Sequence, residues 1–423
     1  MKHKKVLALI LAGGAGGRLD VLTEQRAKPA TPFAGTYRLI DFSLSNCVHS
    51  RITDVWLVEQ YEPHSLNDHL ANGRPWDLDR TYGGLQVLPP FTGRGKGGFA
   101  QGNADAIYRQ RRFIRQFAPD VLLVLSADHV YKLDYSEVVE AHLAGGADVT
   151  MVTTRVANRE EAARFGVVKT DADGRVLDFA YKPERPESDL VTTEVFAYGA
   201  TKLLETLDEL VAESRQDAKN DGEEKEEEGA SLKDFGHRLL PRLVAGGGAS
   251  EYRLQSYWRD LGTVESYWEG HMDLLFRPEA LALDDARWPI LTYGTQRMPA
   301  RIYASARVEN SLISPGCVLR GRVERSVLAP GVRVEEGAVI RDSILLHDVV
   351  VGERAVIDCA VLDELVEVGA NAAVGEKLER PNDGEAAGVT NEDVTLVGRR
   401  TQIAAGARIE RGARLKPVPA EDE

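Results

Sequence analysis

The sequence has little cysteine, no excess of positive charge and no long apolar run. Its three cysteines, Cys47, Cys317 and Cys359, lie far apart and form no CxxC pair. That spacing argues against a zinc site or a disulfide scaffold and fits a reducing compartment. The formal net charge of −14 argues against nucleic acid or an anionic membrane as the main partner, although a local basic pocket for a phosphorylated substrate is still allowed.

The amino-terminal segment has some features of a secretion signal. Residues 1–5 are basic, and an apolar run follows at residues 6–11. This run ends in glycines and is shorter than the ~7–15 apolar residues of a signal peptide. No apolar stretch approaches the ~18–20 residues that span a bilayer. We therefore expect a cytoplasmic protein.

At 423 residues, with 43% hydrophobic and 28% charged residues, the chain is expected to form two or three globular domains. Its first two-thirds alternates short apolar runs with amphipathic stretches, which predicts an α/β fold with a mainly parallel sheet. In such folds ligands bind at the carboxyl ends of the strands. The predicted strands are residues 6–11, 55–58, 121–126 and 149–153, and the predicted helices are residues 103–117 and 135–144.

Two further local patterns lie in this part of the chain. The turn sequence DADG at residues 171–174 predicts a hairpin between residues 167–170 and 176–179. Residues 213–232 include the acidic run DGEEKEEE, which predicts a solvated loop. A regulatory acidic segment is the alternative interpretation.

Hexapeptide-like repeats fill the carboxyl-terminal part. The pattern SLISPG at residues 311–316 recurs as SVLAPG at 326–331, and looser copies follow at 343–348 and 360–363. Their spacing of roughly 15–17 residues matches one three-sided coil of a parallel β-helix. We therefore expect a catalytic domain at residues 1–285, a linker at 286–300 and a left-handed parallel β-helix at 301–423.

A glycine-rich loop, LAGGAGGRL, occupies residues 11–19 directly after the first predicted strand. Glycines let backbone N–H groups approach phosphate oxygens, and Arg18 adds a bidentate cation. Neither the GxGxxG dinucleotide fingerprint nor the glycine-lysine-serine/threonine signature of a P-loop is present. A tight strand-to-helix turn without a ligand is the alternative.

A series of motifs in one order resembles the ADP-glucose pyrophosphorylase (glucose-1-phosphate adenylyltransferase) family. The motifs are the glycine-arginine loop, RAKP at residues 26–29, RLID at 38–41, SNC at 45–47, ADA at 104–106, DHVY at 128–131, KP at 182–183 and WRDLGT at 258–263. The resemblance implies a Rossmann-like, GT-A-like mixed-sheet domain followed by the β-helix. It also implies magnesium-dependent transfer of a nucleotide from ATP to a sugar 1-phosphate with release of pyrophosphate, in a homotetramer.

The resemblance assigns roles residue by residue. It implies Arg18, Lys28 and Asp128 as catalytic residues and Asp128 with Asp260 as ligands of Mg²⁺. The nucleotide-binding candidates are Ala12, Gly13, Gly14, Arg18, Lys28, Gly102, Ala104 and Asp105. The sugar-phosphate candidates are Ala100, Gly166, Tyr181, Lys182, Thr192 and Glu194. Each assignment has a structural alternative. Asp128 could cap a helix, and Asp260 could pair with Arg259. Lys28 could be a solvated surface lysine, Lys182 an exposed hairpin lysine, and Asp105 part of a simple helix start.

Departures from the family pattern lie in the glycine loop and in the sugar pocket. They are Ala15, Gly16 and Gly17 in the glycine loop, Ala100 for an aromatic residue, Asn103 for threonine, Tyr181 for glutamate, Thr192 for serine and Glu194 for glycine. We hypothesise that Glu194 restores a carboxylate for sugar hydroxyls. Gln25 stands where some members carry an activator-binding lysine, so we expect weak or absent activation by sugar bisphosphates.

Two alternatives to this enzyme are a non-catalytic regulatory subunit or sensor of the same fold, and an acyltransferase built on the β-helix. A non-catalytic subunit could dispense with Lys28, Asp128, Lys182 and Asp260, yet all four are present. An acyltransferase generally needs a histidine base within the coils, and His347 is the sole histidine there. A different sugar 1-phosphate or nucleotide is also compatible with the altered sugar pocket.

Overall fold

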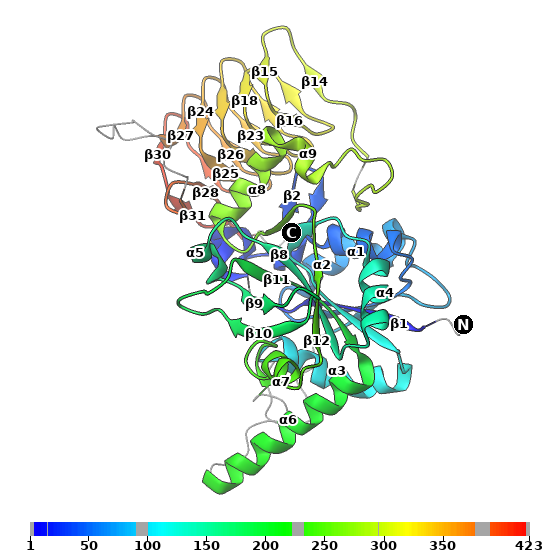
Figure 1. The fold of residues 1–423 in the computed structure, drawn as a ribbon. Helices are drawn as coiled ribbons and strands as arrows, with labels where there is room; N and C mark the ends of the chain where they lie inside the picture. Colours follow the sequence, from blue (N-terminus) through cyan, green and yellow to red (C-terminus); the bar gives the residue numbers. More distant parts are fainter. Residues whose placement is uncertain are drawn as a thin grey trace.

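The computed structural model describes residues 4–14, 16–89, 100–221, 232–294, 296–376 and 390–419. A layered α/β part is followed by a coiled stack of short strands, and the two pack against each other (Figure 1). No helix in these ranges is long and apolar enough to cross a membrane.

The α/β part is built on a nine-stranded mixed sheet. Its main strand order is β10-β9-β11-β6-β1-β4-β5, and β8 and β12 extend it from β11. Strands β6, β1, β4 and β5 run parallel, whereas β11 is antiparallel to β6 and to β8. The strands are β1 (Val6–Ala12), β4 (Asp54–Glu59), β5 (Gly84–Leu88), β6 (Val121–Ser126), β8 (Val149–Arg155), β9 (Gly166–Thr170), β10 (Val176–Tyr181), β11 (Leu190–Gly199) and β12 (Ala249–Arg253).

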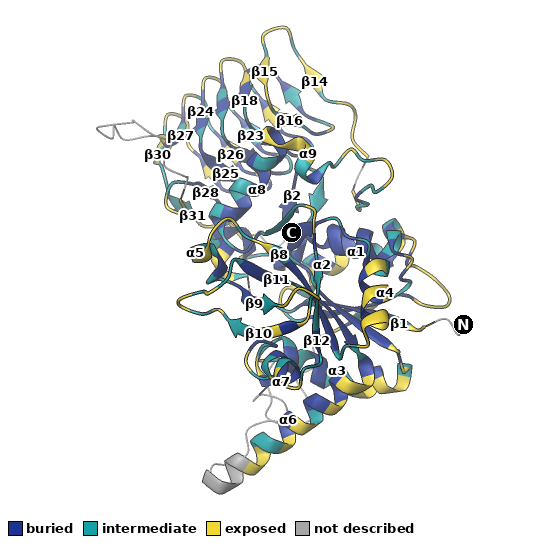
Figure 2. Ribbon diagram, in the orientation of Figure 1, coloured by how far each residue is buried: buried dark blue, intermediate teal, exposed yellow. Residues whose placement is uncertain are grey.

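Helices cover both faces of this sheet, which is why its central strands are apolar throughout. On one face, Leu7 and Leu9 pack with helices α3, α6 and α7. On the other, Ala8 and Ile10 pack with α1, α2 and α4, so the sheet is buried between two layers (Figure 2). The helices are α1 (Ile40–His49), α2 (Pro63–Leu70), α3 (Asn103–Phe117), α4 (Tyr135–Gly145), α5 (Arg159–Ala162), α6 (Ala200–Asp221), α7 (Leu239–Ala245), α8 (Val264–Phe276) and α9 (Pro278–Leu281).

The carboxyl-terminal part is a parallel β-helix with three six-stranded faces. Each coil contributes one short strand to each face, and aliphatic side chains stack inside. The first face is β14 (Arg301–Ile302), β17 (Val318–Leu319), β20 (Arg333–Val334), β23 (Val350–Val351), β26 (Glu367–Val368) and β29 (Gln402–Ile403). The second is β15 (Arg307–Glu309), β18 (Arg322–Glu324), β21 (Val339–Arg341), β24 (Val356–Asp358), β27 (Ala373–Glu376) and β30 (Arg408–Glu410). The third is β16 (Leu312–Ile313), β19 (Val327–Leu328), β22 (Ile344–Leu345), β25 (Ala360–Leu362), β28 (Thr395–Val397) and β31 (Arg414–Leu415).

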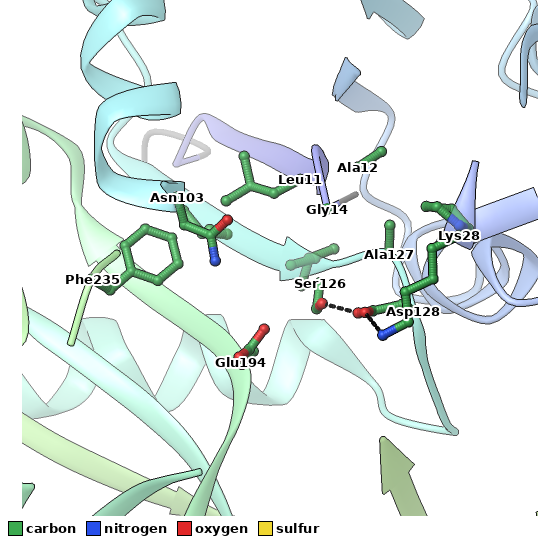
Figure 3. A pocket seen from close by; sticks show the side chains of 13 residues that line it. Leu11, Ala12, Gly14, Lys28, Asn103, Ser126, Ala127, Asp128, Glu194 and Phe235 are labelled. Carbon is green, nitrogen blue, oxygen red and sulfur yellow. Dashed lines mark hydrogen bonds and ion pairs between the residues drawn. The ribbon is translucent and has the colours of Figure 1, made fainter. Parts of the chain in front are cut away.

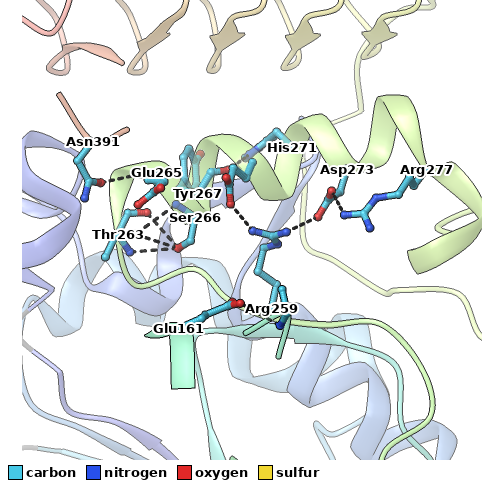
Figure 4. Close-up of polar contacts among 12 residues, drawn as sticks. Glu161, Arg259, Thr263, Glu265, Ser266, Tyr267, His271, Asp273, Arg277 and Asn391 are labelled. Atoms are coloured by element: carbon cyan, nitrogen blue, oxygen red, sulfur yellow. Dashed lines mark hydrogen bonds and ion pairs between the residues drawn. The ribbon is translucent and has the colours of Figure 1, made fainter. Parts of the chain in front are cut away.

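Helix α8 lies between the two parts. Its Tyr267 and Met272 share an apolar cluster with Ile344 and Leu346 of the β-helix. At its start, Thr263 forms a capping box with Ser266. The backbone N–H of Glu265 also donates to Asn391 of the β-helix at 2.8 Å (Figure 4). Packing and hydrogen bonds therefore fix the β-helix to the α/β part through this helix.

Most sequence-based expectations for the fold are confirmed. The predicted hairpin is β9–β10, with Gly174 in its turn at φ 79°. The repeats at residues 311–316, 326–331, 343–348 and 360–363 supply successive strands of one β-helix face. The prediction that a loop begins at residue 213 is wrong, because helix α6 continues through Asp221 and includes residues 213–221. Residues 222–231 of that loop lie outside the described residues.

Candidate active site

The glycine loop leaves the carboxyl end of β1, as the sequence predicts. Gly16 takes a left-handed backbone at φ 71° just before the 3₁₀ turn η1 (Gly17–Thr23). Its carbonyl accepts a hydrogen bond from the Thr23 hydroxyl at 2.9 Å, which holds the turn. Arg18 follows on the exposed side of this turn. The loop therefore presents backbone groups and the exposed side chain of Arg18 at the sheet edge where ligands bind.

Two short strands bring the predicted metal ligands together. Asp128 follows β6 and directly precedes β7 (His129–Tyr131), which pairs antiparallel with β13 (Trp258–Asp260). In this register Asp260 lies opposite His129. Asp128 therefore lies in the short connection between two strands and caps no helix. Arg259 forms ion pairs with Glu269 and Asp273 at 2.6 and 2.8 Å (Figure 4). Asp260 instead lies 3.7 Å from Lys28 and 3.6 Å from His129.

Lys28 lies between these two carboxylates. It is only 7% exposed, so it is not a solvated surface lysine. Its Nζ donates to Asp128 and lies 3.7 Å from an oxygen of Asp260. Burial alone would lower the pKa of Lys28, but the two carboxylates outweigh it and raise that pKa. The lysine is therefore held charged at the carboxyl edge of the sheet.

Asp128 is held ionised by the same contacts. Burial alone would raise its pKa, but the charges of Lys28 and His129 and the hydrogen bonds from Lys28 and Ser126 lower it. His129 Nδ1 lies 3.0 Å from the Thr193 carbonyl. An anionic carboxylate in this position can accept a cation or a metal ion without first losing a proton.

The donor set fits a hard divalent cation. One ligand atom from each of Asp128, His129 and Asp260 lies within 4.8 Å of the others. Oxygen Oδ1 of Asp260 is buried and accepts no hydrogen bond from the described residues. Carboxylate oxygens are the ligands that Mg²⁺ prefers in proteins. A buried carboxylate oxygen without a donor is what such an ion would satisfy.

A cavity of about 110 Å³ opens beside this cluster (Figure 3). Glu194 of β11 points into it and lies between Phe235 and Asp128 in this view. Phe235 forms another wall, and Ala12 and Gly14 bring the glycine loop to its rim. The cavity is thus bounded by the glycine loop, by Lys28 and Asp128, and by a further carboxylate, that of Glu194.

A second cavity of about 280 Å³ adjoins the first and shares Leu11, Gly14 and Asn103 with it. Its lining includes Gly13, Ala100 and Gly102 together with Gln60 and Asp234. Gln60 donates from Nε2 to the Ala100 carbonyl at 3.0 Å. Ala100, a predicted sugar-phosphate residue, thus lines the same cavity as Gly13 and Gly102, which are predicted nucleotide-binding residues.

The start of α3 is stabilised by its own carboxylate. Asp105 is fully buried and accepts hydrogen bonds from the backbone N–H of Gln101 at 3.0 Å and from the Arg109 side chain at 3.1 Å. Ala104 is buried beside it. These contacts give Asp105 a structural role at the helix start, and neither residue lines a described cavity.

The remaining sugar-phosphate candidates lie along β9, β10 and β11. Lys182 is exposed at the end of β10, with its Nζ 4.8 Å from the centre of the Tyr181 ring. Thr192 and Gly166 are buried against each other, and a Cβ added at Gly166 would lie 2.9 Å from the Thr192 hydroxyl oxygen. Of this group, only Glu194 lines the first cavity.

Five residues at the site were missed by the sequence analysis: Gln60, His129, Asn103, Asp234 and Phe235. Gln60 directly follows a correctly predicted strand, so its position at a strand's carboxyl end was a usable signal. His129 adjoins a predicted ligand. Asp234 and Phe235 follow the acidic run, and no local pattern marks them as cavity residues.

A third cavity, of about 740 Å³, lies between the two parts of the molecule. Glu364 of the β-helix lines it and pairs with Arg38 at 3.1 Å, Arg399 at 3.2 Å and Arg26 at 3.3 Å. Burial alone would raise the pKa of Glu364, but the surrounding cations lower it to about 2. This region is outside the predicted site, and weak activation by sugar bisphosphates stays a prediction.

Comparison with known proteins agrees with this geometry. The nucleotidyl transferase family matches residues 7–276, and the GlmU-like C-terminal hexapeptide family matches residues 298–397. A mixed sheet with a glycine loop after β1 and paired aspartates near β6, followed by a β-helix, therefore defines a nucleotidyl transferase with a hexapeptide domain.

Curated relatives narrow this class. A glucose-1-phosphate adenylyltransferase of Thermomicrobium roseum is 42% identical over 99% of this chain and 94% of its own length. Proteins of the same name from Pseudothermotoga lettingae and Acetivibrio thermocellus are 40% and 36% identical, over 96% and 100% of this chain and 93% and 96% of their own lengths. The chain belongs to the glucose-1-phosphate adenylyltransferase family.

Proposed function

We propose that this protein makes ADP-glucose and pyrophosphate from ATP and glucose 1-phosphate, as a step in the synthesis of glycogen or a related α-glucan. The observation that carries the proposal is the buried cluster of Lys28, Asp128 and Asp260 beside the glycine loop. A non-catalytic relative has no need to keep a buried lysine and two carboxylates together. The names of the relatives support the choice of substrates.

In the proposed reaction an oxygen of the sugar phosphate attacks the α-phosphorus of ATP, and the bond from that phosphorus to pyrophosphate breaks. The nucleophile is already an anion, so no serine or cysteine has to be activated. The protein must instead position two polyanions and stabilise charge on the leaving group. Lys28 and Arg18 are the cations proposed for the nucleotide phosphates, and Lys182 is the cation proposed for the sugar phosphate.

Asp128 and Asp260 are the proposed holders of Mg²⁺, which would neutralise phosphate charge when bound. The buried Oδ1 of Asp260, which accepts no hydrogen bond from the described residues, supports this choice. Before the ion binds, the charge of Lys28 lowers the pKa of Asp128, and the same ammonium group lies 3.7 Å from an oxygen of Asp260. Asp128 is therefore both a ligand and an electrostatic partner of the lysine.

The two adjoining cavities support a division of the substrates. The glycine loop and the cavity of Gln60, Ala100 and Gly102 would take the nucleotide, and the cavity of Glu194 would take the sugar. We further propose a homotetramer, in which the β-helix serves as the assembly platform. A cytoplasmic location is supported by the three cysteines, which are all free and buried.

The proposal is tested by measuring pyrophosphate release with five nucleoside triphosphates crossed with several sugar 1-phosphates, with and without Mg²⁺. ATP with glucose 1-phosphate should give the largest kcat/KM, and omission of the ion should abolish turnover. If another pair is preferred, the substrate assignment is wrong. If no pair releases pyrophosphate, the enzyme assignment itself is wrong.

A further inference from the structure

The Glu194 carboxylate faces the first cavity at a structural cost. Its backbone is left-handed at φ 56°, a conformation that disfavours a side chain. The β11–β8 register breaks between Thr192 and Phe196, and Glu194 lies in this irregular stretch. On its other edge, Val195 pairs with Leu125, so Glu194 comes opposite the end of β6. The fold thus keeps a strained glutamate beside the ion cluster.

Among the described residues, the carboxylate of Glu194 has no hydrogen-bond or ion-pair partner that compensates this cost. No hydrogen bond or ion pair joins it to any residue in the described ranges. Burial raises its pKa, against the effect of the neighbouring His129. An unpaired carboxylate that points into a cavity is costly unless a ligand supplies donors.

Tyr181, at the position where the family carries a carboxylate, is occupied elsewhere. Its hydroxyl donates to Asp234 at 3.0 Å, and the other oxygen of Asp234 accepts from the backbone N–H of Asn103 at 3.1 Å. The ring packs so closely on Gly236 that a Cβ there would lie 2.0 Å from it. Tyr181 therefore joins β10 to the start of α3 and lines neither cavity.

We infer that Glu194 is the residue that determines sugar specificity, accepting hydrogen bonds from ring hydroxyls of the sugar 1-phosphate, and that Tyr181 takes no part in sugar recognition. This inference rests on the proposed function. A sugar 1-phosphate carries an anion at one end and hydroxyl donors around the ring. Lys182 supplies the cation for the first, and Glu194 supplies two acceptor oxygens for the second. Glu194 falls outside the group of residues close enough to share a metal ion with Asp128.

The test is steady-state pyrophosphate release by Glu194→Gln and by the full wild-type chain, with glucose 1-phosphate and its 2-, 3-, 4- and 6-deoxy analogues. Glu194→Gln keeps the size of the side chain and removes its charge. Loss of a charge-assisted hydrogen bond should raise KM for glucose 1-phosphate roughly 10–100-fold, while KM for ATP stays within about twofold. For the wild type, at least one deoxy analogue should have a KM that is higher than that of glucose 1-phosphate by a similar factor. Glu194→Gln should no longer distinguish that analogue from glucose 1-phosphate.

Three further variants separate this role from a structural one. Glu187→Gln changes an exposed glutamate of the same region and should leave all kinetic constants unchanged. Tyr181→Phe removes the hydroxyl from Asp234 and should lower the melting temperature without altering the ratio of activities on the deoxy analogues. Glu194→Gly relieves the left-handed backbone, so the melting temperature should hold while KM for the sugar rises.

Several outcomes overturn the inference. Glu194 would be excluded as the sugar contact if Glu194→Gln still discriminated among the deoxy analogues as the wild type does. The same conclusion would follow if the variant required more Mg²⁺ but showed no rise in KM for the sugar phosphate. If Tyr181→Phe changed the discrimination among the deoxy analogues, Tyr181 would take part in sugar recognition and the inference would be wrong. In all these cases the wild type still converts glucose 1-phosphate, whereas failure of the proposed function would leave the wild type inactive on every sugar phosphate.

Discussion

Lys28, Asp128 and Asp260 illustrate how the chemistry depends on single residues. The lysine stays charged because two carboxylates adjoin it, and the lysine in turn lowers the pKa of Asp128. Such a cluster is electrostatically preorganised, since its charges are in place before a substrate arrives.

Substitution of either aspartate should therefore be severe. Asp128→Asn or Asp260→Asn keeps the shape of the side chain but removes the charge that faces Lys28 and the proposed metal ion. Turnover should fall by at least ~10²-fold, the scale lost with a major electrostatic element. Pyrophosphate release measures this, and Asp178→Asn, an exposed carboxylate on β10, is the matched control. Near-normal turnover in both variants would remove the two aspartates from the mechanism.

Lys182 should affect the sugar phosphate specifically. It is exposed at the end of β10, with its ammonium group 4.8 Å from the centre of the Tyr181 ring, so an incoming phosphate can reach it from solvent. Lys182→Ala should raise KM for glucose 1-phosphate by roughly tenfold or more, the loss of one charge-assisted contact, with a small change in KM for ATP. Lys169→Ala, in the adjacent hairpin strand, is the control. An unchanged sugar KM would contradict this role.

At the scale of elements, α8 carries a pH-sensitive group in its interior. His271 is fully buried; it accepts from the backbone N–H of Ala34 at 3.1 Å, and its Nδ1 lies 2.8 Å from the Tyr267 carbonyl. Both ring nitrogens are thus used by the neutral tautomer. Burial lowers the pKa of His271 to about 4, from 6.5.

This predicts a loss of stability in mild acid. Between pH 6.5 and 4 the unfolded chain takes up a proton at His271 that the folded chain does not, so the free energy of unfolding falls as pH decreases. The slope approaches about 1.4 kcal/mol per pH unit for one group. Urea denaturation from pH 7.5 to 5 should show a flatter dependence in His271→Gln than in the wild type. His64→Gln, which alters an exposed histidine, should keep the wild-type slope; equal slopes in all three proteins would refute the prediction.

At the scale of the whole molecule, Arg26 connects the two parts. Its guanidinium donates to Asp363 of the β-helix at 2.8 Å, and both side chains are almost completely buried, at 5% and 2% exposure. Arg26 lies two residues before Lys28, so the contact between the domains also supports the segment that carries this buried lysine.

Breaking this pair from one side should be costly. Arg26→Met leaves the Asp363 carboxylate buried without its cation, and the free energy of unfolding should fall by about 3–5 kcal/mol. The double variant Arg26→Met with Asp363→Leu should be less destabilised, because no charge stays unpaired. Thermal and urea denaturation measure both. Removal of the exposed pair Glu353–Arg354 should cost at most about 1 kcal/mol. A double variant no better than Arg26→Met would contradict the buried-pair argument.

The sequence by itself determined the local elements and the class of the protein. Helix α3 and strand β6 have the bounds that their apolar periodicity predicts, and the repeats predicted four successive coils of the β-helix, because these signals are short-range. Only the tertiary structure decided which residues meet. Asp260 reaches Asp128 through the β7–β13 register, Glu194 faces the cavity through an irregular strand, and Arg26 pairs with a residue 337 positions away. No local pattern encodes such contacts, since they depend on packing and register between segments that are distant in the chain.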